Sequence, residues 1–293
     1  MILLTGATGT TGRRVARRLT KWGYKFTAMV REPEKVSGLK SSKVELIKGD
    51  FKKPDSLRRA MEGIEHAFLL PPNTENQFKL ERNFIDAARE SGVRYLVKYS
   101  AIGADPDSPA RLLRWHGEAE KYLEQSGLRY SIVRPNIFMQ NFTNLYARLI
   151  REEKEFRLPF GDARCGWVDV RDIGRLIARM LTENGHQNNI LTVTGPETLR
   201  CKDLAEILSH AVGKKIEYVD VKPKEFKKEM IETGVPEIMA EAATELFKLV
   251  SDGLCDTVTD TFYEITEKQP RTFEEFVDDN LTFFLKKKSK SKK

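Results

Sequence analysis

Short apolar runs alternate with amphipathic segments along the first two thirds of the chain. The runs have the length of buried strands, and the segments between the early ones have the periodicity of helices. Strands and helices that alternate in this way indicate βαβ units, right-handed crossovers and a parallel sheet. The predicted strands are residues 2–5, 26–30, 44–48, 66–70, 95–100, 130–134 and 190–194, and the predicted helices between the early strands are 12–21, 55–62 and 76–91.

The pattern changes after Gly195, where helical periodicity dominates. Near the end of the chain Thr272 is followed three residues later by Glu275, which is the spacing of a capping box at the start of a helix. A smaller and mostly helical region is therefore predicted here. Its elements are helices at 201–215, 222–234, 235–253 and from 272 onward, with a strand at 216–221.

Together these elements predict an α/β fold, a doubly wound parallel Rossmann sheet with a smaller, mostly helical C-terminal lobe. We expect a Rossmann domain over residues 1–195, from which 156–166 reach toward the second lobe, and a substrate or cap lobe over 196–285. Ligands of open α/β sheets bind outside the carboxyl ends of the strands, so we expect the lobe to cover that crevice.

The charge of the chain is concentrated at its end. The 293 residues include 50 Lys and Arg against 43 Asp and Glu, a formal net charge of +7. Six of the lysines lie in residues 286–293, so the rest of the chain is nearly neutral. We interpret 286–293 as a disordered, solvated tail and expect no nucleic-acid partner.

Several classes of protein do not fit the sequence. Three widely spaced cysteines predict reduced thiols, and four histidines without ligand-like spacing predict no metal site. No apolar run reaches the roughly 18 residues of a membrane span. Because a strand is predicted from Ile2, we expect no targeting peptide and a cytoplasmic protein.

The stretch TGATGTTG joins the first predicted strand to the first predicted helix. Its glycines, Gly6, Gly9 and Gly12, allow a tight turn and a close approach of the backbone to a pyrophosphate, which the N-terminus of the helix attracts. The Gly-Lys-Ser/Thr ending of nucleotide triphosphatase loops is missing, so the loop predicts a dinucleotide cofactor. Hydroxyls that would add hydrogen-bond donors belong to Thr8, Thr10 and Thr11.

The end of the second predicted strand indicates which dinucleotide is bound. An acidic residue there would bind a ribose 2′-hydroxyl, but the sequence has Arg31, followed four residues later by Lys35. Two cations are suited to a 2′-phosphate, which Arg31 would bind in a bidentate manner. Although Glu32 weakens the argument, the pattern favours NADP(H) over NAD(H).

Two further strand ends supply candidate cofactor contacts. Asp50 would bond the adenine amine and Phe51 would stack on its ring, although the same residues would equally form the turn before the next helix. Leu70 and Pro71, after the fourth strand, would contact the nicotinamide side.

The segment HGEAEKYLEQSGLRYSIVRPNIFMQNF resembles the NmrA-like family of atypical short-chain dehydrogenases/reductases. TGATGTTG, VREPEK, GWVDVRDIG, LTVTGPETL and TFEEFVDDN support the resemblance, which covers the chain up to the tail. Within the family the sequence resembles the second type of NADPH-dependent quinone oxidoreductase. The resemblance implies that NADP(H) is bound by Gly6, Thr8, Gly9, Thr11, Gly12, Arg31 and Lys35, and we add Pro135 as a further contact.

The chain departs from the catalytic pattern of the wider superfamily, a Tyr-x-x-x-Lys pair with an upstream Ser. The Lys position falls on His116, the Tyr position on Leu112 and the Ser position near Ser100. Reduction of a ketone yields an alkoxide that needs an acid, whereas reduction of a quinone yields a phenolate-like anion whose conjugate acid has a pKa of roughly 10. The missing tyrosine therefore favours quinones or similar conjugated acceptors.

Candidate catalytic residues are His116, Ser100 and Asn136. His116 would donate a proton or bond the nicotinamide ribose, unless it is a helix residue satisfied by its neighbours. The expected acceptor pocket contains an apolar wall, although plain core packing would explain its Phe and Met equally well. Its residues are Phe138, Met139 and Asn141.

The sequence is compatible with two functions. The first is an NADPH-dependent oxidoreductase that transfers hydride to a quinone-like acceptor, as a monomer or homodimer. The second is a redox sensor that binds NADP(H) and regulates a protein partner with little or no catalysis. A deep apolar cavity over the nicotinamide would favour the enzyme, and a filled crevice with an exposed apolar patch would favour the sensor.

Overall fold

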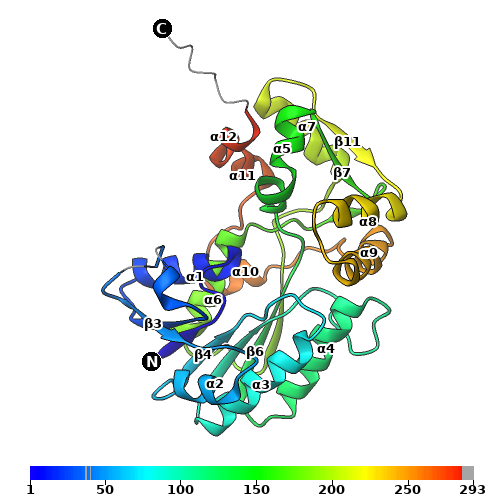
Figure 1. Ribbon diagram of the computed structural model, residues 1–293. Helices are drawn as coiled ribbons and strands as arrows, with labels where there is room; N and C mark the ends of the chain where they lie inside the picture. Colours follow the sequence, from blue (N-terminus) through cyan, green and yellow to red (C-terminus); the bar gives the residue numbers. More distant parts are fainter. Residues whose placement is uncertain (37, 40, 286–293) are drawn as a thin grey trace. The chain divides into compact units, whose positions relative to one another are not determined.

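Figure 1 shows the computed structural model of the protein, which describes residues 1–36, 38–39 and 41–285. The tail predicted at 286–293 lies outside the described residues. The chain forms two compact units, and each is assembled from separate stretches of sequence. The first unit contains Met1–Asn136, Val170–Val193 and Thr259–Gln269, and the second contains Ile137–Asp169, Thr194–Val258 and the chain from Pro270 onward.

The first unit contains a seven-stranded sheet in which every neighbouring pair of strands is parallel. Its order, β3-β2-β1-β4-β5-β6-β9, is the Rossmann order with one strand added beside β6. The strands are β1 (Ile2–Leu4), β2 (Phe26–Val30), β3 (Val44–Lys48), β4 (His66–Leu69), β5 (Tyr95–Tyr99), β6 (Arg129–Pro135) and β9 (Asn189–Val193).

The predicted Rossmann fold is confirmed. Each of the seven predicted strands is present, and none of their ends differs from the prediction by more than one residue. The inner strands are apolar throughout because helices cover both faces of a parallel sheet. Neighbouring residues of β1, such as Leu3 and Leu4, point to opposite faces, and both are fully buried.

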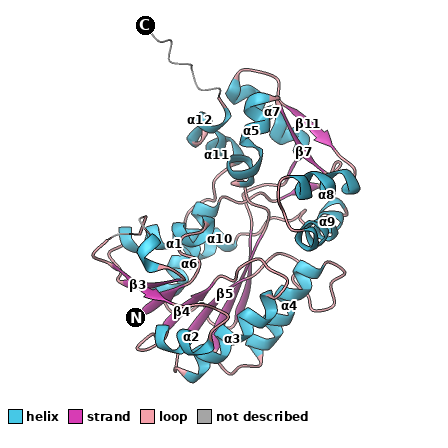
Figure 2. Ribbon diagram, in the orientation of Figure 1, coloured by secondary structure: helices cyan, strands magenta, loops and turns pink. Residues whose placement is uncertain are grey.

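Helices lie on both faces of the sheet, as Figures 1 and 2 show. On one face α1 (Thr10–Lys21) packs against α6 (Val170–Thr182), and α10 (Thr261–Thr266) packs against α6. The opposite face carries α2 (Pro54–Ala60), α3 (Gln77–Glu90) and α4 (Arg111–Glu124). The core under α2 and α3 includes Leu57, Phe84 and Leu96, all fully buried.

The second unit is mostly helical and has two short strand pairs. β7 (Glu155–Leu158) runs parallel to β11 (Glu217–Asp220), and β8 (Arg164–Cys165) runs antiparallel to β10 (Leu199–Arg200). Its helices are the π-helical turn η2 (Phe142–Tyr146), α5 (Ala147–Glu152), α7 (Cys201–Val212), α8 (Pro223–Glu232), α9 (Glu237–Ser251), α11 (Phe273–Asp279) and α12 (Leu281–Phe284).

The start of α11 has the geometry that the capping-box spacing predicted. The Glu275 N–H donates to Thr272 Oγ1 at 3.2 Å, and the Thr272 N–H donates to Glu275 Oε2 at 3.0 Å. None of the described helices in either unit is long and apolar enough to span a bilayer.

The two compact units differ from the division expected at residue 195. Residues 137–169 belong to the second unit, where β7 pairs with β11. Residues 259–269 belong to the first unit, where α10 packs against α6. Both differences arise from contacts between segments far apart in the sequence, which local periodicity does not reveal.

Candidate functional site

The glycine loop lies between β1 and α1 in the first unit. Gly6 has a φ of +62°, and its carbonyl oxygen accepts the Gly9 N–H at 2.9 Å. A Cβ atom added at Gly12 would lie 2.1 Å from that same oxygen. The loop backbone thus packs directly on the start of α1 without room for a side chain. This cradle beside a helix N-terminus fits the pyrophosphate of a dinucleotide.

Thr5, which sequence reasoning missed, fixes the end of β4 beside this loop. Its Oγ1 donates to the Phe68 carbonyl at 2.9 Å and accepts the Leu70 N–H at 2.8 Å. The Leu70 side chain is so close to Gly6 that an added Cβ would meet Leu70 Cδ2 at 2.6 Å. Leu70, and Pro71 after it, therefore lie next to the loop, as expected for contacts with a bound dinucleotide.

The three loop threonines differ in their surroundings. Thr8 and Thr10 are exposed, so their hydroxyls are accessible to a phosphate. Thr11 is buried, and its Oγ1 lies 3.2 Å from the Tyr99 hydroxyl at the end of β5. Burial raises the pKa of that phenol, which stays protonated. The Thr11 side chain therefore ties α1 to the sheet, and a contact of this residue with phosphate would use its backbone N–H.

Both cations predicted to bind a 2′-phosphate lie on the surface after β2. Arg31 follows the strand directly and is exposed. Lys35 ends the 3₁₀ turn η1 (Pro33–Lys35), and its Nζ lies 2.8 Å from Glu32 Oε1. Exposed pairs of this kind are weak, so a doubly charged phosphate would compete well with Glu32 for the ammonium. Arg31 is therefore the main candidate for cofactor discrimination.

Asp50 and Phe51 have contacts typical of the turn before α2. Asp50 Oδ1 accepts the Lys52 N–H at 2.9 Å. The Phe51 ring stacks on Phe84 with centroids 5.5 Å apart and packs against the core under α3. Their contacts with adenine remain predictions.

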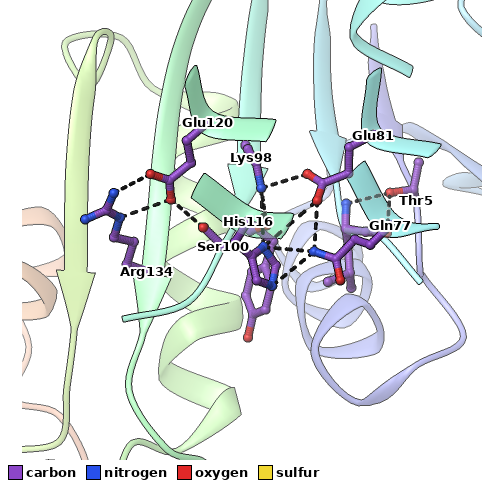
Figure 3. A network of polar contacts seen from close by, with 10 residues as sticks. Thr5, Gln77, Glu81, Lys98, Ser100, His116, Glu120 and Arg134 are labelled. Carbon is purple, nitrogen blue, oxygen red and sulfur yellow. Dashed lines mark hydrogen bonds and ion pairs between the residues drawn. The ribbon is translucent and has the colours of Figure 1, made fainter. Parts of the chain in front are cut away.

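A buried polar network crosses the face of β5 that α3 and α4 cover (Figure 3). Lys98 Nζ on β5 lies 2.7 Å from Glu81 Oε2 on α3, and both side chains have no exposed surface. Gln77, one turn before Glu81, donates from Nε2 to Glu81 Oε1 at 3.0 Å. The same amide nitrogen lies 3.1 Å from Nδ1 and 3.2 Å from Nε2 of His116 on α4.

The network holds His116 in its neutral form. Burial lowers the pKa of the imidazole well below its usual range, and the positive charges of Lys98 and Arg134 lower it further. Burial raises the pKa of Glu81, against the opposing effects of the Lys98 ammonium and the Gln77 amide. If His116 donates a proton near neutral pH, it does so from the N–H of a neutral ring.

Ser100 and His116, both predicted from the sequence, belong to this network, but Ser100 has a partner of its own. Its hydroxyl donates to Glu120 on α4, which also forms an ion pair with Arg134 Nη2. Arg134 Nε donates to Glu120 Oε1 at 3.0 Å. These contacts indicate that Ser100 helps to fix the carboxylate of Glu120, a role that sequence reasoning did not foresee.

Comparison with family models decides which group of proteins this site belongs to. The model of the NmrA-like family matches residues 1–277. The chain belongs to the NmrA-like family. The resemblance noted in the sequence is thereby confirmed.

Named relatives and solved structures are similar to this chain along nearly their whole length. An NAD(P)H azoreductase of Xenophilus azovorans is 37% identical over 276 residues, which are 94% of this chain and 96% of the relative. The structure of an Escherichia coli NADPH-dependent quinone oxidoreductase complexed with NADPH has a TM-score of 0.88 at 26% identity, covering 96% of this chain and 100% of that one. Citrobacter sp. triphenylmethane reductase complexed with NADP(H) has a TM-score of 0.84 at 26% identity, covering 94% and 98%.

The remaining predicted residues of this NmrA-like chain lie at and after the end of β6. Pro135 and Asn136 are buried in the first unit, where the Asn136 N–H donates to the Val193 carbonyl at 2.9 Å. The next residues belong to the second unit. Met139 is 1% exposed, and its N–H donates to the Val168 carbonyl at 3.0 Å, so it has the contacts of a core residue. Phe138 and Asn141 are half-buried, and all three remain predictions as acceptor contacts.

Proposed function

We propose that this NmrA-like protein is an NADPH-dependent oxidoreductase that transfers hydride to a quinone-like or other conjugated acceptor. The observation that carries the proposal is the combination of three features. They are a dinucleotide cradle, the exposed Arg31 directly after β2, and a neutral, buried His116 at the position of the superfamily lysine. The relatives named above as azoreductase, quinone oxidoreductase and triphenylmethane reductase act on conjugated acceptors, which supports the same choice.

In this proposal the residues of the first unit bind and orient the cofactor, which supplies the hydride. The backbone of Gly6, Gly9 and Gly12 lies against the pyrophosphate, and Arg31 and Lys35 bind the 2′-phosphate. Leu70, held against Gly6, lies on the nicotinamide side. Positioning of the reacting groups then accounts for most of the rate enhancement.

The basicity of the anion that hydride transfer leaves on the acceptor determines which acceptors suit this site. A neutral imidazole N–H is a weak acid that gives little driving force for protonation, so His116 suits an acceptor whose reduced anion needs little help from an acid. A hydroquinone anion meets this condition because phenols have pKa values of roughly 10. The alkoxide from an aliphatic ketone is far more basic and would need the tyrosine that the chain lacks. Phe138, Met139 and Asn141 are proposed to contact the acceptor.

Steady-state consumption of NADPH with three kinds of acceptor tests this function. We expect turnover with benzoquinones and with an azo dye, and turnover slower by about a hundredfold or more with an aliphatic ketone, because general acid catalysis contributes at least that much to ketone reduction. Comparable turnover of the ketone would contradict the proposed chemistry. Tight NADPH binding with no turnover of any acceptor would instead support a redox sensor.

Arg31→Ala is expected to weaken NADPH binding by about ten- to a hundredfold, because it removes a charge-assisted hydrogen-bonding group from the 2′-phosphate. NADH, which lacks that phosphate, should bind almost as before. Fluorescence titration of both cofactors measures the difference. Arg129→Ala is the matched control. It removes an exposed arginine at the start of β6, whereas Arg31 follows the end of β2. Equal losses of affinity for both cofactors would show that Arg31 does not bind the 2′-phosphate.

A further inference from the structure

The ion pair between Lys98 and Glu81 is unusual because neither side chain has any exposed surface. Moving two charges out of water costs so much that a buried ion pair stabilises a fold little better than two apolar side chains of similar size. Stability alone therefore does not explain why an ammonium lies in the middle of an apolar strand. The contact between Lys98 and His116 suggests another reason.

Besides Glu81, Lys98 contacts the Tyr99 carbonyl, to which Nζ donates at 3.2 Å, and the ring of His116. Lys98 Nζ lies 3.5 Å from His116 Nδ1, so the ammonium touches both the carboxylate and the ring (Figure 3). An ammonium can only donate hydrogen bonds. Nδ1 must therefore be the unprotonated nitrogen of the neutral ring, and the ring proton is on Nε2. Gln77 Nε2 lies 3.1 Å from Nδ1 and 3.2 Å from Nε2 of the ring, so the tautomer is assigned from the Lys98 contact and not from Gln77.

Among these three charged or titratable side chains, His116 alone has exposed surface. Its side chain is 11% exposed, whereas Lys98 and Glu81 are completely buried. The other charged groups around it are Arg134 and Glu120, which are paired with each other. The imidazole thus connects the buried Lys98 ammonium to a side chain that is partly exposed.

We propose that Lys98 is a positioning residue that acts through His116. Lys98 holds the ring proton on Nε2, and when Nε2 gives this proton to the reduced acceptor, Lys98 donates a proton to Nδ1. The inference rests on the proposed function, because the anion left by hydride transfer is the destination of the proton.

The Nε2–H bond of His116 breaks as an O–H or N–H bond forms on the acceptor anion, and an N–H bond of the Lys98 ammonium breaks as one forms at Nδ1. His116 remains neutral throughout, and Lys98 becomes a neutral amine beside Glu81. A proton from water, taken up at Nε2, restores the starting state as Nδ1 returns its proton to Lys98.

The test uses the double variant Lys98→Met/Glu81→Gln in the full-length protein. Because it removes both buried charges, neither is left without its partner, and the fold should be retained. The matched control, Arg58→Met/Glu90→Gln, removes an exposed ion pair that joins α2 to the same helix α3. We expect the double variant to bind NADPH as the wild type does, and its kcat to fall by about a hundredfold with little change in KM. The control should keep wild-type kcat.

Nitrogen-15 NMR of the histidines gives a readout that is independent of turnover. In the wild type the His116 proton should be on Nε2 throughout the neutral pH range. In the double variant the tautomer should no longer be fixed, and the pKa of His116 should rise because the nearby ammonium is gone.

The outcomes separate this inference from the proposed function. A wild-type protein that binds NADPH but reduces no acceptor would refute the proposed function and the proton transfer together. Undiminished kcat in a folded double variant would refute the role of Lys98 alone. A wild-type His116 protonated on Nδ1 would overturn the inference whatever the turnover.

Discussion

Lys98→Met alone is expected to lower the free energy of unfolding by about 3–5 kcal/mol, the usual cost of removing one partner from a buried ion pair. The variant leaves the Glu81 carboxyl completely buried without its ammonium partner. Urea unfolding of the single and double variants measures the effect. Glu81→Gln in the same chain should restore most of the loss, because it removes the charge that was left without a partner.

The loss should also depend on pH. Burial already raises the pKa of Glu81, and without Lys98 the folded-state pKa rises further above the value in the unfolded chain. Between these two pKa values the folded state binds more protons than the unfolded state, so stability falls as pH rises. The variant should therefore lose more stability at about pH 8 than at about pH 5. An equal loss of stability at both pH values would show that Glu81 does not titrate. The control is Arg58→Met, which disrupts an exposed ion pair and should change the stability little at either pH.

Gly12→Ala is expected to weaken NADPH binding by about a hundredfold or more. Its Cβ would lie 2.1 Å from the Gly6 carbonyl oxygen and 2.5 Å from the Gly6 carbonyl carbon, so the loop backbone has to move away from α1. Overpacking of this kind costs about 1–3 kcal/mol, and the displaced N–H groups lose their alignment with the pyrophosphate.

Cofactor titration and thermal unfolding together separate binding from folding in this variant. Gly38→Ala is the control, since an added Cβ there meets nothing within 4 Å. NADPH and NADH should lose affinity equally in Gly12→Ala, because both carry the pyrophosphate. Wild-type affinity in a folded variant would contradict the assignment of the loop as the cofactor cradle.

The sheet was predictable because each of its strands is a short apolar run set between helical segments. The division of the chain into units was not, because β7 finds its partner β11 more than fifty residues later. The glycine loop was recognised from its spacing together with its place between a predicted strand and a predicted helix. In contrast, the burial of the Thr11 hydroxyl depends on Tyr99 at the end of a distant strand, which only the folded sheet brings next to it.

The charged members of the buried polar network were missed because each of them looks ordinary in the sequence. Glu81 and Glu120 resemble solvent-facing helix residues, and Lys98 interrupts an apolar strand only once. A signal was nevertheless present in the spacing. Polar residues recur four apart on both helices, at 77 and 81 and at 116 and 120. They also recur two apart at 98, on β5, and at 100, directly after that strand. Each spacing places its pair on one face of its element.

The late position of β9 in the chain has a consequence during synthesis. β6 ends at Pro135, but the strand that pairs with its outer side ends only at Val193. At the usual 5–20 residues per second, the ribosome takes roughly 3–12 s to deliver that strand. For this interval the nascent sheet has an open edge at β6, whose unpaired N–H and C=O groups are available to neighbouring nascent chains. On a crowded polysome, chaperone protection is therefore most valuable between the synthesis of the sixth and seventh sheet strands.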